Sequence, residues 1–180
     1  MAYGYLVEAS IAAKDIGSLN KSAVSTVAVA GGGLVALTAS STKGNDVFTA
    51  TVPATGALGG LYMAYNPSYH YVDGLYAGLS ADPRVFTNDI GYTFDVFKPK
   101  LYDEIVVTID CVDATSSAIV VGDFLEPKNA QTLLTRIAAG TGATAGSTSF
   151  KVVAISTLPF PKARVGMDYV TCYKLICVQE

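Results

Sequence analysis

The only histidine of the chain, His70, lies in a stretch from Tyr62 to Ser80 that also contains five of the eleven tyrosines. Histidine is a natural general base near neutral pH, and Ser68 or Ser80 would be the nearest nucleophile. The supporting groups are missing, because the sequence has no G-x-S-x-G elbow and no second histidine for a metal site. We therefore expect His70 to be a packing or surface residue.

Two acidic pairs have the residue types needed for acid–base chemistry or for holding a cation, namely Asp103 with Glu104 and Asp110 with Asp113. Asp103 and Glu104 begin a predicted strand, and Asp110 falls on the face of that strand opposite its apolar face. No D-x-[DN]-x-[DN]-G calcium loop is found in the sequence. We expect these carboxylates to be solvated charges and predict no metal site.

The segment 140–145, GTGATA, fits the loose G-x-G-x-x-G/A pattern of dinucleotide-binding loops. That pattern binds a pyrophosphate only where it opens a helix, because the N–H groups at the helix N-terminus face the ligand. Here a predicted strand follows. The sequence therefore predicts a loop of small residues and no cofactor.

The three cysteines, Cys111, Cys172 and Cys177, are an odd number and form no C-x-x-C pair. In an extended strand Cys172 and Cys177 point to opposite faces, which disfavours a bridge between them. We expect all three to be buried, small apolar residues.

The tyrosines are better candidates for a functional surface. Tyrosine buries a large contact area while freezing few rotors, and Asn66, Pro67 and Gly74 are turn residues within the tyrosine-rich stretch. Alternation within the segment 61–65 leaves ordinary core packing as an equal alternative. The predicted protein-contact residues are Tyr3, Tyr5, Tyr65, Tyr69, His70, Tyr71 and Tyr76.

The elements that would position these residues are predicted to be strands. The chain has 180 residues, of which 51% are hydrophobic and only 15% charged, and this favours a single all-β domain. Segment 23–40 is predicted to be a hairpin, and 129–139 a strand with a helix as the alternative. Turn signals between the strands predict an antiparallel barrel or sandwich. The other predicted strands are 47–52, 92–97, 104–112, 117–125, 150–156 and 169–178.

Two segments lack a core pattern. Residues 1–22 are expected to form an extended N-terminal arm that orders on a partner, which leaves 23–180 as the β-rich domain. Residues 138–149 contain no large side chain and are expected to form a long, flexible loop.

Charge and hydropathy exclude several classes of protein. A formal net charge of −3 with scattered Lys and Arg provides no basic patch, so we expect no direct contact with nucleic acid. The N-terminus lacks the pattern of a secretory signal, and no window of eighteen apolar residues exists. We therefore expect a soluble protein that is made in the cytoplasm and does not enter a membrane.

Six motifs follow one another in a distinctive order, although each alone is a generic strand with a turn. They are VFTATVP (47–53), GLYMAYNP (60–67), FTNDIGYTFDVF (86–97), YDEIVVTIDCVD (102–113), VGDFLEP (121–127) and FKVVAI (150–155). This succession resembles small structural proteins of tailed bacteriophages that infect Gram-positive bacteria. Those proteins are capsid decoration proteins, also called cement or head auxiliary proteins.

The resemblance implies a non-enzymatic virion protein that assembles in the host cytoplasm and stabilises the shell from its outer surface. Its partners would be the phage major capsid protein and other copies of itself, with a trimer expected and a dimer or monomer as alternatives. A tail-tube or other self-assembling virion component is the second hypothesis, and it would polymerise through open sheet edges. A small β-barrel hydrolase or ligand-binding protein that depends on His70 is a remote third.

Overall fold

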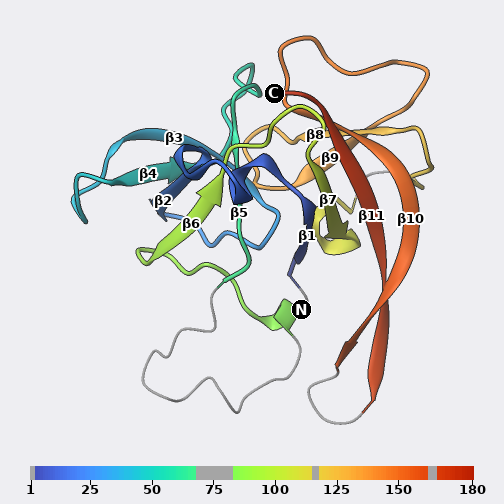
Figure 1. Ribbon diagram of the computed structural model, residues 1–180, viewed down its shortest axis with the longest axis horizontal. Helices are drawn as coiled ribbons and strands as arrows, with labels where there is room; N and C mark the ends of the chain where they lie inside the picture. The colour runs from blue at the N-terminus through green and yellow to red at the C-terminus, as the bar shows by residue number, and fades with distance from the viewer. Residues whose placement is uncertain (1–2, 68–82, 115–117, 162–165) are drawn as a thin grey trace.

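The computed structural model describes residues 3–67, 83–114, 118–161 and 166–180, without the side chains of Glu8 and Ala9. The described chain forms one small all-β domain made of a six-stranded antiparallel sheet and a closed five-stranded barrel (Figure 1). The predicted fold class is therefore confirmed.

The sheet has the strand order β1-β7-β11-β10-β8-β9. Its strands are β1 (Leu6–Ser10), β7 (Glu104–Thr108), β8 (Phe124–Pro127), β9 (Leu134–Ile137), β10 (Ser149–Pro161) and β11 (Met167–Gln179). The barrel has the order β2-β4-β3-β5-β6, in which β2 and β4 are parallel and the other described pairs are antiparallel. Its strands are β2 (Asn20–Ser25), β3 (Leu34–Ser40), β4 (Val47–Thr51), β5 (Tyr62–Ala64) and β6 (Thr93–Phe97).

In the described part of the chain, four short 3₁₀ turns lie between these strands: η1 (Ala12–Lys14), η2 (Gly17–Leu19), η4 (Pro83–Val85) and η5 (Ile109–Cys111). Within the described residues no helix is long and apolar enough to cross a membrane.

One hydrophobic core joins the sheet to the barrel. Leu175, Phe150 and Ile105 from the sheet pack in the same buried cluster as Met63 and Phe97 from the barrel. A second cluster fills the inside of the barrel with mostly small side chains, because five strands enclose little space. It contains Ala23, Val29, Val35, Ala50, Ala64, Phe94 and Val96.

Residues 3–22, which were expected to form an arm, are packed into this domain. β1 pairs antiparallel with β7, and Leu6 and Ile11 are buried in the shared core. Asn66 binds the free side of β1 like a short piece of strand: the Leu6 N–H donates to Asn66 Oδ1 at 2.8 Å, and Asn66 Nδ2 donates to the Leu6 carbonyl at 2.6 Å. The apolar pattern of this segment is too short to show at the sequence level, because a five-residue edge strand buries few side chains.

Most predicted strands are confirmed, but several have different bounds. The strand predicted at 104–112 stops at Thr108, because the chain turns into η5. The strand predicted at 117–125 begins only at Phe124, because Gly122 has a positive φ of 98° and the Asp123 carboxylate accepts the Val120 N–H at 2.9 Å.

Two other predictions concern pairing. The hairpin predicted for 23–40 is wrong, since β4 lies between β2 and β3 in the barrel. The strand predicted for 129–139 is confirmed over Leu134–Ile137, where β9 pairs antiparallel with β8. Residues 138–148 form a loop, as predicted.

Candidate functional site

The β10–β11 hairpin is much longer than the strands beside it. Its paired residues run from Ser149↔Gln179 to Pro161↔Met167, whereas β8 pairs only with Phe150 and Lys151. On the other side, β7 reaches β11 only as far as Cys172. Beyond that residue the hairpin continues as a two-stranded ribbon at one end of the sheet (Figure 1).

The side of the β10–β11 hairpin that is buried changes along its length. Near the end of β11 the residues Tyr173, Leu175 and Cys177 are buried in the core, whereas at its start Val170 and Cys172 are buried instead. A two-stranded ribbon twists strongly, so the side that faces the core at one end turns away from the domain at the other. The ribbon therefore has a covered inner face and an uncovered outer face at its projecting end.

The inner face is held by two segments from elsewhere in the chain. Arg84 of η4 is 5% exposed and donates to Asp168 Oδ2 at 2.8 Å, while its guanidinium carbon lies 4.8 Å from the centre of the Phe160 ring. Tyr5 packs edge-to-face on Phe160 with a centroid distance of 5.5 Å. A second carboxylate oxygen, Asp110 Oδ2, lies 3.9 Å from Arg84 Nη1. We call this group the ribbon clasp.

The clasp makes the projecting ribbon rigid, because it combines aromatic packing with a buried cation that is held by two carboxylates. Tyr3 strengthens the attachment, since its N–H donates to the Arg84 carbonyl at 2.7 Å. The N-terminal segment therefore holds the ribbon in place.

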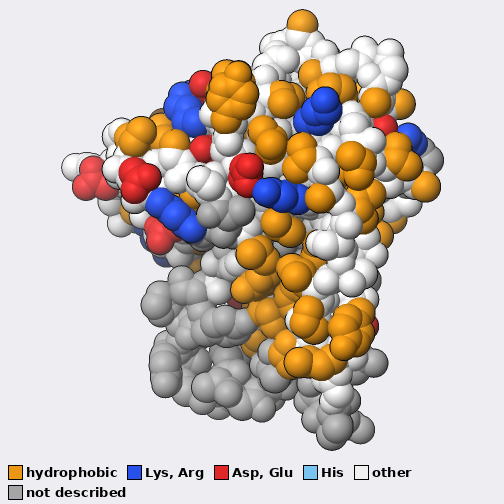
Figure 2. All heavy atoms as spheres, turned by 45° about the vertical axis from the view of Figure 1, so that its right-hand side comes forward, with side chains coloured by type: hydrophobic (Ala, Val, Ile, Leu, Met, Phe, Trp, Pro, Cys, Tyr) orange, Lys and Arg blue, Asp and Glu red, His pale blue; other side chains and the backbone are white. Residues whose placement is uncertain are grey.

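Among the described residues, those on the outer face carry no charge. Tyr169 is 71% exposed, Met167 55% and Ile155 41%, and Pro159 is exposed beside Tyr169 in the register of the two strands. Figure 2 shows hydrophobic side chains gathered over this end of the hairpin. The outer ribbon face consists of Ile155, Thr157, Pro159, Pro161, Met167, Tyr169 and Thr171.

An apolar surface of this kind on a small domain is typical of a protein-contact site, because water makes its exposure unfavourable. Tyrosine and methionine are also enriched in such interfaces. None of the seven residues that define the outer ribbon face is charged, so this face offers no charged group to an ion.

The predicted contact residues fall into two groups, those outside the described residues and those within them. Tyr69, His70, Tyr71 and Tyr76 lie outside the described residues. Among the described ones, Tyr3 is 39% exposed, while Tyr5 belongs to the ribbon clasp.

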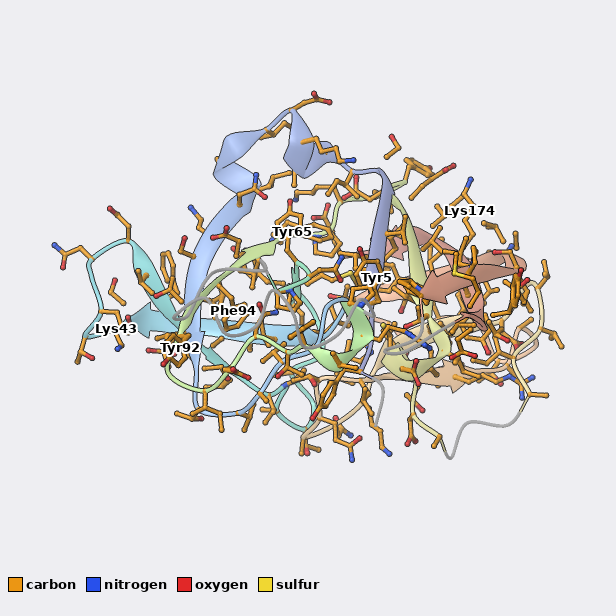
Figure 3. All side chains as sticks on the ribbon, turned by 90° about the horizontal axis from the view of Figure 1, so that it is seen from below. Tyr5, Lys43, Tyr65, Tyr92, Phe94 and Lys174 are labelled. Atoms are coloured by element: carbon orange, nitrogen blue, oxygen red, sulfur yellow. The ribbon has the colours of Figure 1, made fainter. Side chains whose placement is uncertain are left out.

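Tyr65 lies apart from the ribbon. Its hydroxyl donates to Asn20 Oδ1 at 2.8 Å and its ring packs on Phe97 with a centroid distance of 4.8 Å. In Figure 3, Tyr5 and Tyr65 lie between the barrel end, marked by Lys43 and Tyr92, and the sheet end, marked by Lys174. Tyr5 and Tyr65 are thus mainly packing residues, and the structure does not join them into one exposed surface.

A shallow hollow of about 480 Å³ lies beside Tyr65 on the outside of the barrel. Its polar groups already bond one another: Ser22 donates to Asp95 Oδ1 at 3.0 Å, and Asn20 bonds both the Tyr65 hydroxyl and the Ala13 carbonyl. This arrangement stabilises the barrel and offers few polar groups to a ligand. The residues that line the hollow are Asn20, Lys21, Ser22, Tyr65 and Asp95.

The expectation that the acidic pairs are solvated is wrong for two of the four residues. Asp103 is buried and accepts the backbone N–H groups of Ala12 and Lys100, each at 2.8 Å. Asp113 is buried and pairs with Lys128 at 2.7 Å. Buried loop N–H groups need acceptors, and a carboxylate supplies them more compactly than the backbone does.

Two further buried carboxylates were not predicted. Glu126 accepts the Thr144 N–H at 2.6 Å and the Ser149 hydroxyl at 2.8 Å. Asp123 accepts the Ala139 N–H at 3.1 Å and the Arg136 Nε–H. These two residues hold both ends of the loop 138–148, so their role is structural.

The pKa of Asp123 reflects this arrangement. Burial alone would raise the pKa, but the hydrogen bonds from Arg136, Val120 and Ala139 and the positive charge of Arg136 outweigh it and hold the pKa below 3.8. Asp123 is therefore ionised at neutral pH and is not poised for proton transfer.

The cysteines are buried, as predicted. Burial raises the pKa of Cys111 to about 12 and that of Cys177 to about 11, and it also raises the pKa of Cys172. All three thiols are protonated at neutral pH, which makes them poor nucleophiles. Among the described residues no group of three or more His, Cys, Asp or Glu side chains is placed to hold a metal ion.

Comparison with protein-family models, with curated protein sequences and with solved structures found no match. The resemblance described in the sequence analysis therefore stays a prediction.

Proposed function

We propose that this chain is a virion structural protein of a tailed bacteriophage, which binds the outer surface of the capsid and stabilises the shell. The partner is the major capsid protein, and the protein acts as a homo-oligomer for which a trimer is expected. The observation that carries the proposal is the outer ribbon face, an uncharged apolar surface on a hairpin that projects from the sheet.

Such a surface suits a protein that acts by binding. A ligand that binds only the assembled lattice stabilises that lattice by mass action, and repetition over many copies makes a modest contact sufficient. The clasp behind the ribbon favours this role, because a rigid contact surface loses little conformational entropy when it binds.

The two outermost strands of the sheet, β1 and β9, offer few groups for strand addition. Asn66 occupies the N–H and carbonyl of Leu6 on the free side of β1. At the other edge, β9 has only four residues, and the Asp113 N–H donates to the Leu134 carbonyl at 2.8 Å. A tube built by strand addition needs open edges, and β1 and β9 offer few free groups, whereas the ribbon strands keep unpaired edges beyond Lys151 and Cys172.

The test uses empty shells purified from a phage mutant that lacks this protein. Wild-type protein is expected to co-sediment with the shells at saturable stoichiometry. The double substitution Met167→Ser/Tyr169→Ser is expected to weaken binding by about tenfold or more, as for loss of interface anchors.

A matched control removes two comparably exposed apolar side chains from the turn before the barrel strand β6. Ile90 and Tyr92 are 59% and 58% exposed, and Ile90→Ser/Tyr92→Ser is expected to bind like wild type. Light scattering with negative-stain microscopy addresses the alternative: rings or tubes formed without shells would support a tail component and refute decoration.

A further inference from the structure

The projecting part of β11 leaves one edge of its backbone without a partner. The Cys177 N–H donates to the Asp103 carbonyl at 2.9 Å and the Cys177 carbonyl accepts the Tyr102 N–H at 2.8 Å, so both groups face away from β10. Backbone groups alternate sides along a strand, and the one register shift in this part of the hairpin inserts its extra residue into β10. The odd-numbered residues of β11 therefore all turn their N–H and carbonyl groups outward.

Three of these residues lie beyond Cys172, where the pairing of β11 with β7 ends. They are Met167, Tyr169 and Thr171. No hydrogen bond among the described residues uses their outward backbone groups. The start of β11 is therefore an open strand edge.

The opposite edge of the same ribbon is interrupted by proline. Pro159 and Pro161 lie opposite Tyr169 and Met167, so their backbone nitrogens also face outward. Proline has no N–H to donate, and its presence on an edge hinders the addition of another strand. At the outermost strands of the sheet, Asn66 covers β1 and β9 has only four residues. The edge of β11 is thus the best site for strand addition that the described residues offer.

The side chains along this edge do not oppose pairing. Natural edges are often protected by lysine, by proline or by a bulge, and residues 167–171 of the described chain have none of these. The one charged residue among them, Asp168, bonds Arg84 on the inner face. Tyrosine, valine and threonine, which occupy 169–171, all favour strands.

We infer that this edge of β11 pairs antiparallel with the same edge of a second copy of the chain. Strand addition needs an open edge on both partners, and every copy brings the one that the structure shows. Because each copy supplies a single edge of this kind, identical edges meet about a two-fold axis and the assembly closes at two copies. The inference assigns a dimer in place of the expected trimer.

The value of this dimer at the capsid rests on the proposed function. Stabilising a shell requires a protein to hold neighbouring subunits, whereas each copy has one outer ribbon face. Residues that lie opposite each other in antiparallel strands point to the same side of the sheet, so pairing through β11 places two outer ribbon faces side by side. Two equivalent faces on one particle bind a lattice more tightly than one.

The first measurement is the mass of the full-length protein by sedimentation velocity, without shells and over a range of concentrations. Wild-type protein is expected to form a dimer that dissociates on dilution. Tyr169→Pro removes the central outward N–H and should weaken the dimer about tenfold or more, because a two-fold contact loses the bond twice. Tyr169→Ser removes the same ring but keeps the N–H, and it should dimerise within a few-fold of wild type.

Tyr169→Lys is a second variant, which keeps the N–H at an exposed position and does not threaten folding. Like charges across a strand pair repel each other, so this dimer should be weaker than that of Tyr169→Ser and should recover in part when salt is added. Urea denaturation of each variant checks that the protein is folded.

The outcomes separate a second copy from the shell as the partner of this edge. Monomeric wild-type protein, a trimer, or a dimer that both Tyr169→Pro and Tyr169→Lys leave intact would overturn the inference. Monomeric wild-type protein whose binding to empty shells is lost in Tyr169→Pro but kept in Tyr169→Ser would assign the edge to the shell and also overturn it. A wild-type dimer that the substitutions weaken as expected but that binds no shells would refute the proposed function and leave the pairing intact.

Discussion

The two faces of the β10–β11 ribbon are built by the same two strands, but the molecule covers only one of them. Phe160 and Val170 on the inner face are 5% and 6% exposed, whereas Met167 and Tyr169 on the outer face are 55% and 71% exposed. Both faces are largely apolar. The difference therefore comes from the N-terminal segment and η4, which supply Tyr5 and Arg84 to the inner face alone.

This comparison separates stability from binding. The inner face should determine how firmly the ribbon is held, and the outer face should determine what it binds. Substitutions on the inner face should therefore lower the free energy of unfolding. Substitutions on the outer face should weaken binding and leave the free energy of unfolding nearly unchanged.

The largest effect is expected from deleting residues 2–10. The deletion removes β1 and Tyr5, and the loss of the buried Leu6 side chain alone should cost about 2–5 kcal/mol. Near-UV circular dichroism should show loss of fixed tertiary packing. Native packing in the deleted protein would contradict the claim that this segment holds the ribbon.

Arg84→Ala is expected to destabilise the fold by about 2–4 kcal/mol, because it leaves Asp168 and Asp110 without this cation and uncovers Phe160. Urea denaturation measures the loss. Lys43→Ala, an exposed cation on the barrel, is the control and should change stability by less than about 0.5 kcal/mol. Equal effects of the two substitutions would show that the clasp does not support the ribbon.

The pH dependence of stability should show the contribution of Asp123, a buried carboxylate whose pKa is lowered in the folded protein. The folded pKa of Asp123 is below 3.8, so its contribution is fully present above about pH 4 and is lost as the pH falls through the folded value. Asp123→Asn should lower the free energy of unfolding by about 2 kcal/mol at pH 7 and by less at pH 3. A difference that stays constant between pH 7 and pH 3 would refute this assignment.

The smallest effect on stability is expected on the outer face. Met167→Ser/Tyr169→Ser should change the free energy of unfolding by no more than about 0.5 kcal/mol, because neither side chain is buried. Urea denaturation of this variant beside Arg84→Ala tests the comparison directly. A large loss would mean that the outer face is covered within the molecule.

Local patterns predicted much of the fold. The strands at 47–52, 92–97 and 169–178 and the burial of the cysteines follow from alternation and composition. The change of buried side along β11 does not, because it depends on ribbon twist and on contacts from Tyr5 and Arg84, which are far away in sequence. Period-two alternation assigns one buried face to a whole strand.

The candidate site was harder to predict for the same reason. Arg84 looks like a scattered surface charge, and Tyr169 looks like a core residue of a regular strand. Two of the buried carboxylates had a weak signal, since Asp103 and Asp113 lie next to the ends of the strand predicted at 104–112, whereas Asp123 lies inside the strand predicted at 117–125.

The order of strands in the sheet also determines when the protein can fold during synthesis. β1 has β7 as its partner, with Leu6 opposite Val107, and β7 has β11 as its second partner, with Val107 opposite Tyr173. At roughly 5–20 residues per second, a ribosome needs several seconds to extend the chain from β7 to β11. Throughout that interval the edge of β7 that pairs with β11 has no partner, so the sheet closes late and mostly through contacts distant in sequence, which are slow to form.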